Sequence, residues 1–96
     1  MVLSKRIWQF DDGVDIITSS YVVHTFALSD VDDPDVYAAG PIFDWERSEA
    51  GKWVIKNAYD KPSWHRQMDY MLYGYNYQIR AELTPEQITF FELKFK

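Results

Sequence analysis

The clearest pattern of hydrophobic and polar positions lies between residues 73 and 83. Every second residue there is apolar: Tyr75, Tyr77, Ile79, Ala81 and Leu83 alternate with Asn76, Gln78, Arg80 and Glu82. A period of two residues is that of a strand with one buried and one solvated face. The pattern therefore predicts an antiparallel strand whose core face carries the tyrosines at 75 and 77.

A predicted β-hairpin occupies the first 28 residues. Residues 4–10 alternate over a short stretch, and residues 14–28 are rich in β-branched and aromatic side chains, as strands are. The Asp11–Gly13 segment between them is a turn signal, because glycine accepts positive φ and aspartate tolerates it. We expect one strand at 4–10, followed by one bent strand or two short ones broken near Ser19 and Ser20.

The next segment carries the signals of a helix start. Asp33 is a predicted N-cap, the proline after it suits the first helical position, and the helix dipole favours Asp35 in the first turn. Gly40–Pro41 predicts an interruption, because proline disfavours helical geometry in the preceding residue. Gly51 is a predicted helix end. Residues 34–50 are therefore expected to form one kinked helix or two short ones.

The secondary structure of the remaining segments is predicted from weaker patterns. Residues 52–58 alternate and predict a strand, while residues 60–69, which contain Pro62, predict a loop or irregular crossing. Thr84–Gln87 matches a capping box. Residues 84–95 stay open between helix and strand, because their apolar residues recur at both spacings. We favour a helical turn that leads into a terminal strand.

These elements predict a single α+β domain over residues 1–96. Its centre is a small antiparallel sheet of about four strands, accompanied by one kinked or two short helices. A chain of 96 residues allows one modest core and no second one.

Charge and composition narrow the function classes. The net charge is −5, with −7 in residues 1–50 and +2 in residues 51–96. An acidic half repels phosphate backbones, so we expect no nucleic acid as partner. The same half leaves open the mimicry of nucleic acid by carboxylates. The chain contains no cysteine, which excludes disulfides and thiolate metal sites. No apolar run is long enough to span a bilayer, so we expect no membrane partner and a cytoplasmic location.

The acidic cluster of Asp30, Asp32, Asp33 and Asp35 invites a calcium site. An EF-hand loop needs an oxygen ligand at its fifth position and glycine at its sixth. The chain has Pro34 and an aspartate at these places. We therefore predict no metal and no cofactor, and interpret the acids as a solvated helix N-terminus.

A catalytic interpretation is no better supported. Ser63, His65 and Asp69 lie close in sequence, but a catalytic triad is defined by three-dimensional geometry and this spacing matches no mechanistic motif. We predict no catalytic residues and no enzyme activity.

Binding is the favoured interpretation of the Trp64–Arg66 segment. An indole, an imidazole and a guanidinium follow one another at Trp64, His65 and Arg66, and tryptophan and arginine dominate binding hot spots. We predict that these three residues lie on a loop and contact a partner together with the acids of residues 30–35. Trp64 has two possible roles: an anchor in a partner's pocket, or a buried ring that staples its own loop.

Four segments, Gly40–Trp45, Gly51–Val54, Trp64–Arg66 and Phe91–Phe95, resemble small uncharacterised proteins of tailed bacteriophages. The resemblance covers about the last two-thirds of the chain. It implies a setting in which small proteins bind a host factor or block a host defence. The leading hypothesis is a phage-encoded accessory protein that binds and inhibits or redirects a host protein, as a homodimer in the host cytoplasm. The alternative is a self-associating structural or assembly protein of the virion.

Overall fold

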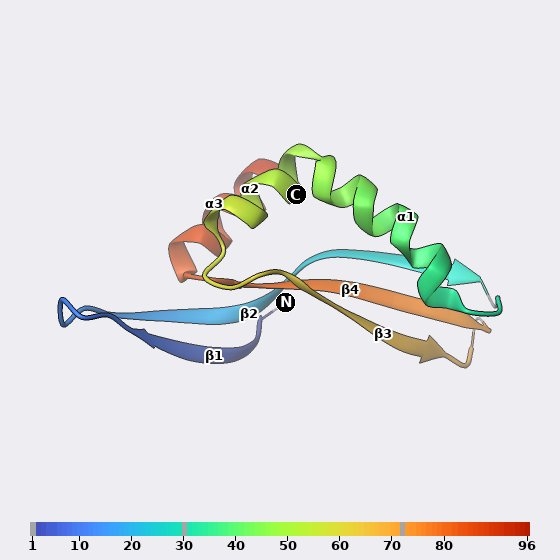
Figure 1. Ribbon diagram of the computed structural model, residues 1–96, viewed down its shortest axis with the longest axis horizontal. Coiled ribbons are helices and arrows are strands. Elements are labelled where there is room, and N and C mark those ends of the chain that lie inside the picture. Colours follow the sequence, from blue (N-terminus) through green and yellow to red (C-terminus); the bar gives the residue numbers. More distant parts are fainter. Residues whose placement is uncertain (1, 30, 72) are drawn as a thin grey trace.

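The computed structural model describes residues 2–29, 31–71 and 73–96 (Figure 1). Within these residues, the elements in chain order are β1 (Val2–Gln9), β2 (Asp15–Ser29), α1 (Pro34–Arg47), α2 (Glu49–Asn57), β3 (Ser63–Asp69), β4 (Gly74–Leu83) and α3 (Pro85–Phe95). The strands form one antiparallel sheet in the order β1-β2-β4-β3. The α+β class is confirmed, with three helices.

The helices arch over one face of the sheet and leave the other face open (Figure 1). The molecule measures 49 × 24 × 23 Å. Its long axis follows β2, whose first part pairs with β1 and whose later part pairs with β4. The β1–β2 hairpin extends past the helices as an arm, and Gly13 in its turn has a φ of 82°. The predicted hairpin across this glycine is confirmed.

Strand β4 lies at the centre of the sheet and has the predicted alternation. Tyr77, Ile79, Ala81 and Leu83 are buried, whereas the residues between them are partly exposed. Tyr75, which was also predicted on the core face, is only half-buried. β4 pairs with β2 through Tyr77 opposite Phe26, and with β3 through Ile79 opposite Trp64. These pairs place Trp64 and Tyr77 on the face that the helices cover.

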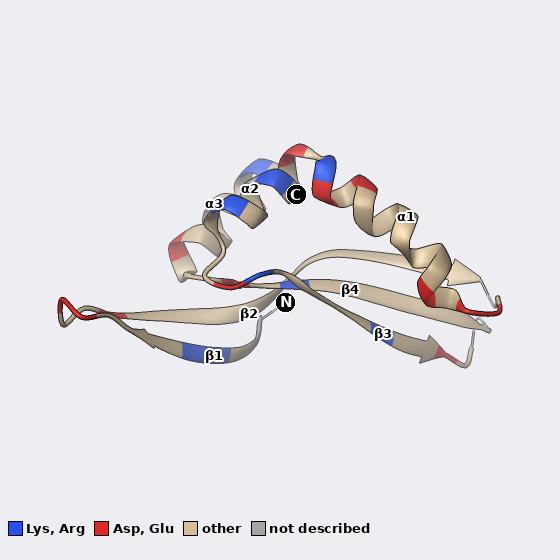
Figure 2. Ribbon diagram, in the orientation of Figure 1, with Lys and Arg blue, Asp and Glu red and all other residues tan. Residues whose placement is uncertain are grey.

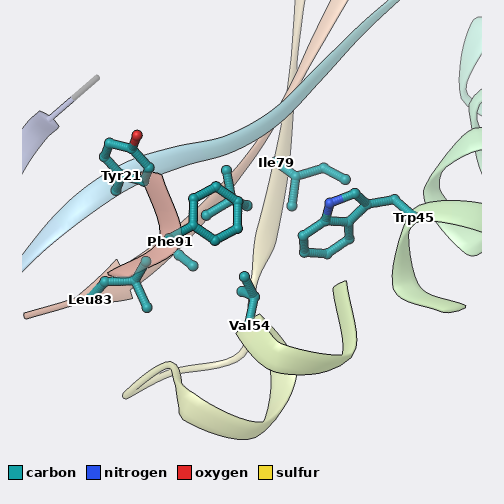
Figure 3. Packing of buried hydrophobic residues seen from close by; sticks show 8 residues of the cluster. Tyr21, Trp45, Val54, Ile79, Leu83 and Phe91 are labelled. Carbon is teal, nitrogen blue, oxygen red and sulfur yellow. The ribbon is translucent and has the colours of Figure 1, made fainter. Parts of the chain in front are cut away.

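The hydrophobic core lies between this face and the helices (Figure 3). Tyr21 and Leu83 come from the sheet, Trp45 and Val54 from the first two helices, and Phe91 from α3. The Tyr21 and Phe91 rings meet edge to face at 6.1 Å. This packing explains why α3 runs to Phe95, and the predicted terminal strand is wrong. The capping box at Thr84 and Gln87 is confirmed.

Helix α1 continues through Pro41, so the predicted interruption at Gly40–Pro41 is wrong. A proline inside a helix costs one backbone hydrogen bond. Ala38 before it and Trp45 after it are both buried, and this burial holds the two halves in one continuous helix. The break comes later, at Ser48, whose hydroxyl accepts from the Gly51 backbone N–H and caps α2.

The strand predicted at residues 52–58 is wrong, because residues 52–57 belong to α2 and Ala58 is its C-cap. Buried and half-buried positions recur at Ala50, Val54 and Asn57, which is helical spacing. Gly51 lies inside this helix instead of ending the one before it. A Cβ there would overlap the carbonyl oxygen of Trp45, so the glycine lets the two helices approach closely.

Of the two forms predicted for residues 14–28, the structure has the single strand, β2, with no break at Ser19 and Ser20. Its irregularity lies between Val22 and His24. The expected loop over residues 60–69 contains β3, the second edge of the sheet. β3 is almost entirely exposed, so its sequence lacks the alternation of a half-buried strand.

Candidate binding site

A pocket opens between the first two helices and the beginning of β3. Its volume is about 270 Å³. It is lined by residues of α1, α2, β3, β4 and the segment before β3, namely Ile42, Trp45, Glu46, Ile55, Lys61, Pro62, Ser63, Trp64 and Ile79. We call it the β3 pocket. Most of its lining is apolar, which suits a hydrophobic group.

Trp64, on β3, forms part of the wall of the β3 pocket. Its side chain packs against Tyr77 with ring centroids 5.8 Å apart, yet 44% of the residue is exposed. Trp64 is therefore neither a buried staple nor a free side chain. One face of the indole is supported by the sheet, and the remainder is available to a ligand.

Trp45 contributes a hydrogen-bond donor to the same region. Its indole N–H has no hydrogen-bond partner among the described residues, and every buried side-chain N or O atom among them has one. The N–H therefore remains accessible to solvent. In Figure 3 the nitrogen edge of the indole is turned towards Ile79, which also lines the pocket.

The structure brings together two predicted site residues that are distant in sequence, Asp35 and Arg66. Arg66 Nη1 donates to Asp35 Oδ1 at 3.0 Å, and the Tyr77 hydroxyl donates to the same oxygen at 2.7 Å. Asp35 lies in the first turn of α1, Arg66 on β3 and Tyr77 on β4. The carboxylate thus connects the start of the helix to two strands beside Trp64.

Two pKa values respond to this cluster. The carboxylate of Asp35 raises the pKa of the Arg66 guanidinium, and the Tyr77 hydroxyl adds to the effect. Burial raises the pKa of the Tyr77 phenol, with the hydrogen bond to Asp35 as the next cause. Both shifts hold the cluster in the state with a charged Arg66 and a neutral Tyr77.

His65 is separated from its neighbours by the strand geometry. It pairs with Gln78 and points to the open face, because successive residues of a strand face opposite sides. Its Nε2 lies 3.2 Å from the Ser63 hydroxyl. Partial burial lowers the pKa of His65, and the positive charge of Arg80 lowers it further. The predicted trio is therefore divided between two faces.

The acidic residues of the predicted site are also divided. Asp33 occupies the N-cap position of α1, but its backbone is left-handed with φ of 51° and its side chain makes no capping hydrogen bond. Asp32 is exposed beside it, and Asp30 lies outside the described residues. Of these acids, Asp35 alone is shown in contact with the Trp64–Arg66 segment.

The sequence interpretation missed the aliphatic half of the pocket, Ile42 and Ile55. Ile55 lies on α2, which the sequence pattern assigned to a strand, so its direction was not predictable. The proximity of Pro62 to Trp64 was visible in the sequence, whereas their position beside α1 and α2 is a tertiary result.

Across residues 2–29, 31–71 and 73–96, no group of three or more histidine or acidic side chains is arranged to hold a metal ion. No helix in that part of the chain is long and apolar enough to cross a membrane. Comparisons with protein-family models, with curated proteins and with solved structures give no match.

Proposed function

We propose that this chain is a binding protein whose β3 pocket receives an apolar side chain of another protein. The observation that carries the proposal is an apolar pocket that stays open beside an exposed edge strand, with Trp64 forming part of its wall. Interfaces concentrate their binding energy in such aromatic-walled pockets.

The contacts around Asp35 support this proposal. The ion pair with Arg66 and the Tyr77 hydrogen bond fix the start of α1 against the sheet next to the pocket. A site built on fixed elements loses less conformational freedom when it binds. Arg66 still has 42% of its side chain exposed, so its remaining N–H groups can reach a partner.

The proposed partner is a host protein, which this chain inhibits or redirects as a phage-encoded accessory protein, with a defence component as one class of target. This part of the proposal rests on the resemblance to phage proteins. The pocket supports only the part of the proposal that concerns protein binding.

The test compares capture of a bacterial protein by two matched variants. Ile55→Arg places a charge in the pocket wall, at a residue that is 50% exposed. Phe43→Arg places the same charge on α1 outside the pocket, at a residue that is 55% exposed. Both variants are expected to fold. Capture from a bacterial lysate should be lost with Ile55→Arg and kept with Phe43→Arg. Equal capture by both variants would remove the pocket from the proposal.

Self-association, as in a virion assembly protein, is the second candidate, and the β1–β2 arm favours it. Ile7 and Ile17 are cross-strand partners that are 61% and 52% exposed, and β1 is an edge strand. Apolar surface of this kind favours a homodimer. Sedimentation should then show a dimer for the natural chain and a monomer for Ile17→Arg. A monomer at all concentrations contradicts this candidate.

A further inference from the structure

The free edge of β3 and the β3 pocket lie side by side. β3 is the last strand of the sheet, so its outward backbone N–H and C=O groups are available to another strand. Trp64 and Ser63 belong both to this edge and to the pocket lining. A segment that paired with β3 would therefore pass directly over the pocket mouth.

Arg66 on β3 is paired with Asp35, but two cations beside this edge, Lys61 and Arg80, have no carboxylate partner within the described residues. The Lys61 side chain makes no ion pair or hydrogen bond within the described residues, and Arg80 donates only to the neutral amide of Gln78. Both line a shallow depression with Ser63 on the open face.

Two carboxylates line the same depression, and one of them is paired with a cation. Asp60 pairs with Arg6 at 3.2 Å, and Glu82 accepts from the Thr18 hydroxyl at 2.9 Å. Most other acids lie at the tip of the arm, at the start of α1 and on the helices (Figure 2). The chain is acidic as a whole, yet with Asp60 paired to Arg6 the depression holds Lys61 and Arg80 against Glu82, an excess of one positive charge.

We propose that β3 accepts, as a fifth strand, an extended segment of a partner protein in which apolar and acidic residues alternate. An apolar side chain of that segment enters the β3 pocket on the helix side. The acidic residue next to it points to the open face and meets Lys61 and Arg80. This inference rests on the proposed function and specifies the chemistry of the partner.

A second copy of this chain suits the β3 edge poorly. Arg66 is the middle residue of β3, and antiparallel pairing of β3 with itself about its centre would place Arg66 opposite Arg66. Like charges directly opposite each other destabilise a strand pair. The other edge strand, β1, does not line the β3 pocket. We therefore assign the docking edge to β3 and the docked segment to a different protein.

The experiment uses synthetic peptides in which leucine alternates with aspartate, and measures binding to the full chain by fluorescence anisotropy. The Leu/Asp peptide should bind at least tenfold more tightly than a Leu/Lys peptide of the same length. N-methylation of the peptide backbone, which removes its strand hydrogen bonds, should weaken binding at least tenfold. Ile55→Arg should weaken it similarly, because the pocket is then blocked.

Charge reversal gives the matched control. Lys61→Glu should weaken the Leu/Asp peptide and strengthen the Leu/Lys peptide, while Lys5→Glu on the distant edge strand β1 should change neither. Equal binding of the two peptides, equal effects of Lys61→Glu and Lys5→Glu, or unchanged binding after N-methylation would each overturn the inference. A dimer that Lys61→Glu dissolves would identify the occupant as a second copy and overturn it too.

The outcomes also separate this inference from the proposed function. If Ile55→Arg abolishes capture of a bacterial protein while no Leu/Asp peptide binds, the pocket binds a protein but not an acidic strand. If the variant changes neither capture nor peptide binding, both ideas fail together.

Discussion

Asp35 and Arg66 are 31 positions apart in the chain and form an ion pair of 3.0 Å. The pair joins the first turn of α1 to the edge strand β3. It also unites the acidic segment and the Trp64–Arg66 segment at one point, although the rest of each segment lies elsewhere. The same Asp35 oxygen accepts from Tyr77, which is fully buried.

Replacement of Asp35 should cost stability through Tyr77. Asp35→Ala removes the acceptor of a buried hydroxyl, and we expect a loss of about 1 kcal/mol in the free energy of unfolding. Asp32→Ala, at an exposed residue outside the cluster, is the control and should change little. In a double-mutant cycle, Asp35→Ala should cost less when Tyr77→Phe is already present. Additive losses in denaturant titrations would show that the hydrogen bond does not contribute.

Arg66→Ala should affect binding more than folding. The side chain is exposed and its ion pair is screened by solvent, so we expect an almost unchanged melting temperature. Binding of the partner should weaken at least tenfold. Undiminished binding in a titration of the captured partner would show that Arg66 only pairs with Asp35 at the start of α1 and does not contact the partner.

Ile79 and Gln78 are neighbours on opposite faces of β4. Ile79 is 2% exposed, so Ile79→Ala should cost about 2–4 kcal/mol through lost burial and the cavity left behind. Gln78→Ala should stay within about 0.5 kcal/mol. Denaturant titration measures both, and small equal losses would contradict the assigned faces.

Two helical glycines should respond oppositely to the same substitution. Gly51→Ala puts a Cβ against the backbone of Trp45, and such overpacking costs about 1–3 kcal/mol. A Cβ on Gly40 meets nothing within 4 Å, so Gly40→Ala should stabilise by roughly 0.5–1 kcal/mol. Thermal unfolding of the two variants tests this, and an unchanged or raised melting temperature for Gly51→Ala would contradict the close approach of α1 and α2.

Acid should destabilise the fold through His24. Partial burial lowers the pKa of His24 below its ordinary 6.5, so the folded chain binds the proton more weakly than the unfolded one. The contribution is fully present above about pH 6.5 and is lost as the pH falls towards the folded pKa. The denaturant concentration at the unfolding midpoint should therefore be lower at about pH 5 than at about pH 8. His24→Gln should reduce that fall more than His65→Gln, because His65 lies on an exposed strand. An identical pH profile for the natural chain and His24→Gln would contradict this origin.

The sequence predicted an element correctly where a local signal, such as alternation, a turn residue or a cap, agreed with the packing in the fold. The alternation of β4, the glycine turn of the arm and the Thr84 capping box each fix a local geometry, and each is confirmed. Tertiary packing decided the other elements. Burial of Ala38 and Trp45 keeps α1 continuous through Pro41, and burial of Val54 makes residues 49–57 a helix.

The candidate site could be predicted only in part. The sequence indicated Trp64 and Arg66 by residue type, and both lie at the site. The direction of His65 followed from a strand that the pattern did not predict, because an exposed edge strand needs no alternation. Ile42 and Ile55 join the site through the packing of two helices, for which no local signal exists.

The central pair of the sheet also sets the order in which the chain can fold on the ribosome. β2 leaves the ribosome early, but its neighbour β4 and the core residue Phe91 are synthesised only after α1, α2 and β3. Until then one edge of β2 is unpaired and Tyr21 lacks its packing partner. An unpaired, apolar strand edge is the kind of surface on which nascent chains aggregate. The pairing of β2 with β4 and the packing of Tyr21 on Phe91 are therefore late events in the synthesis of the chain.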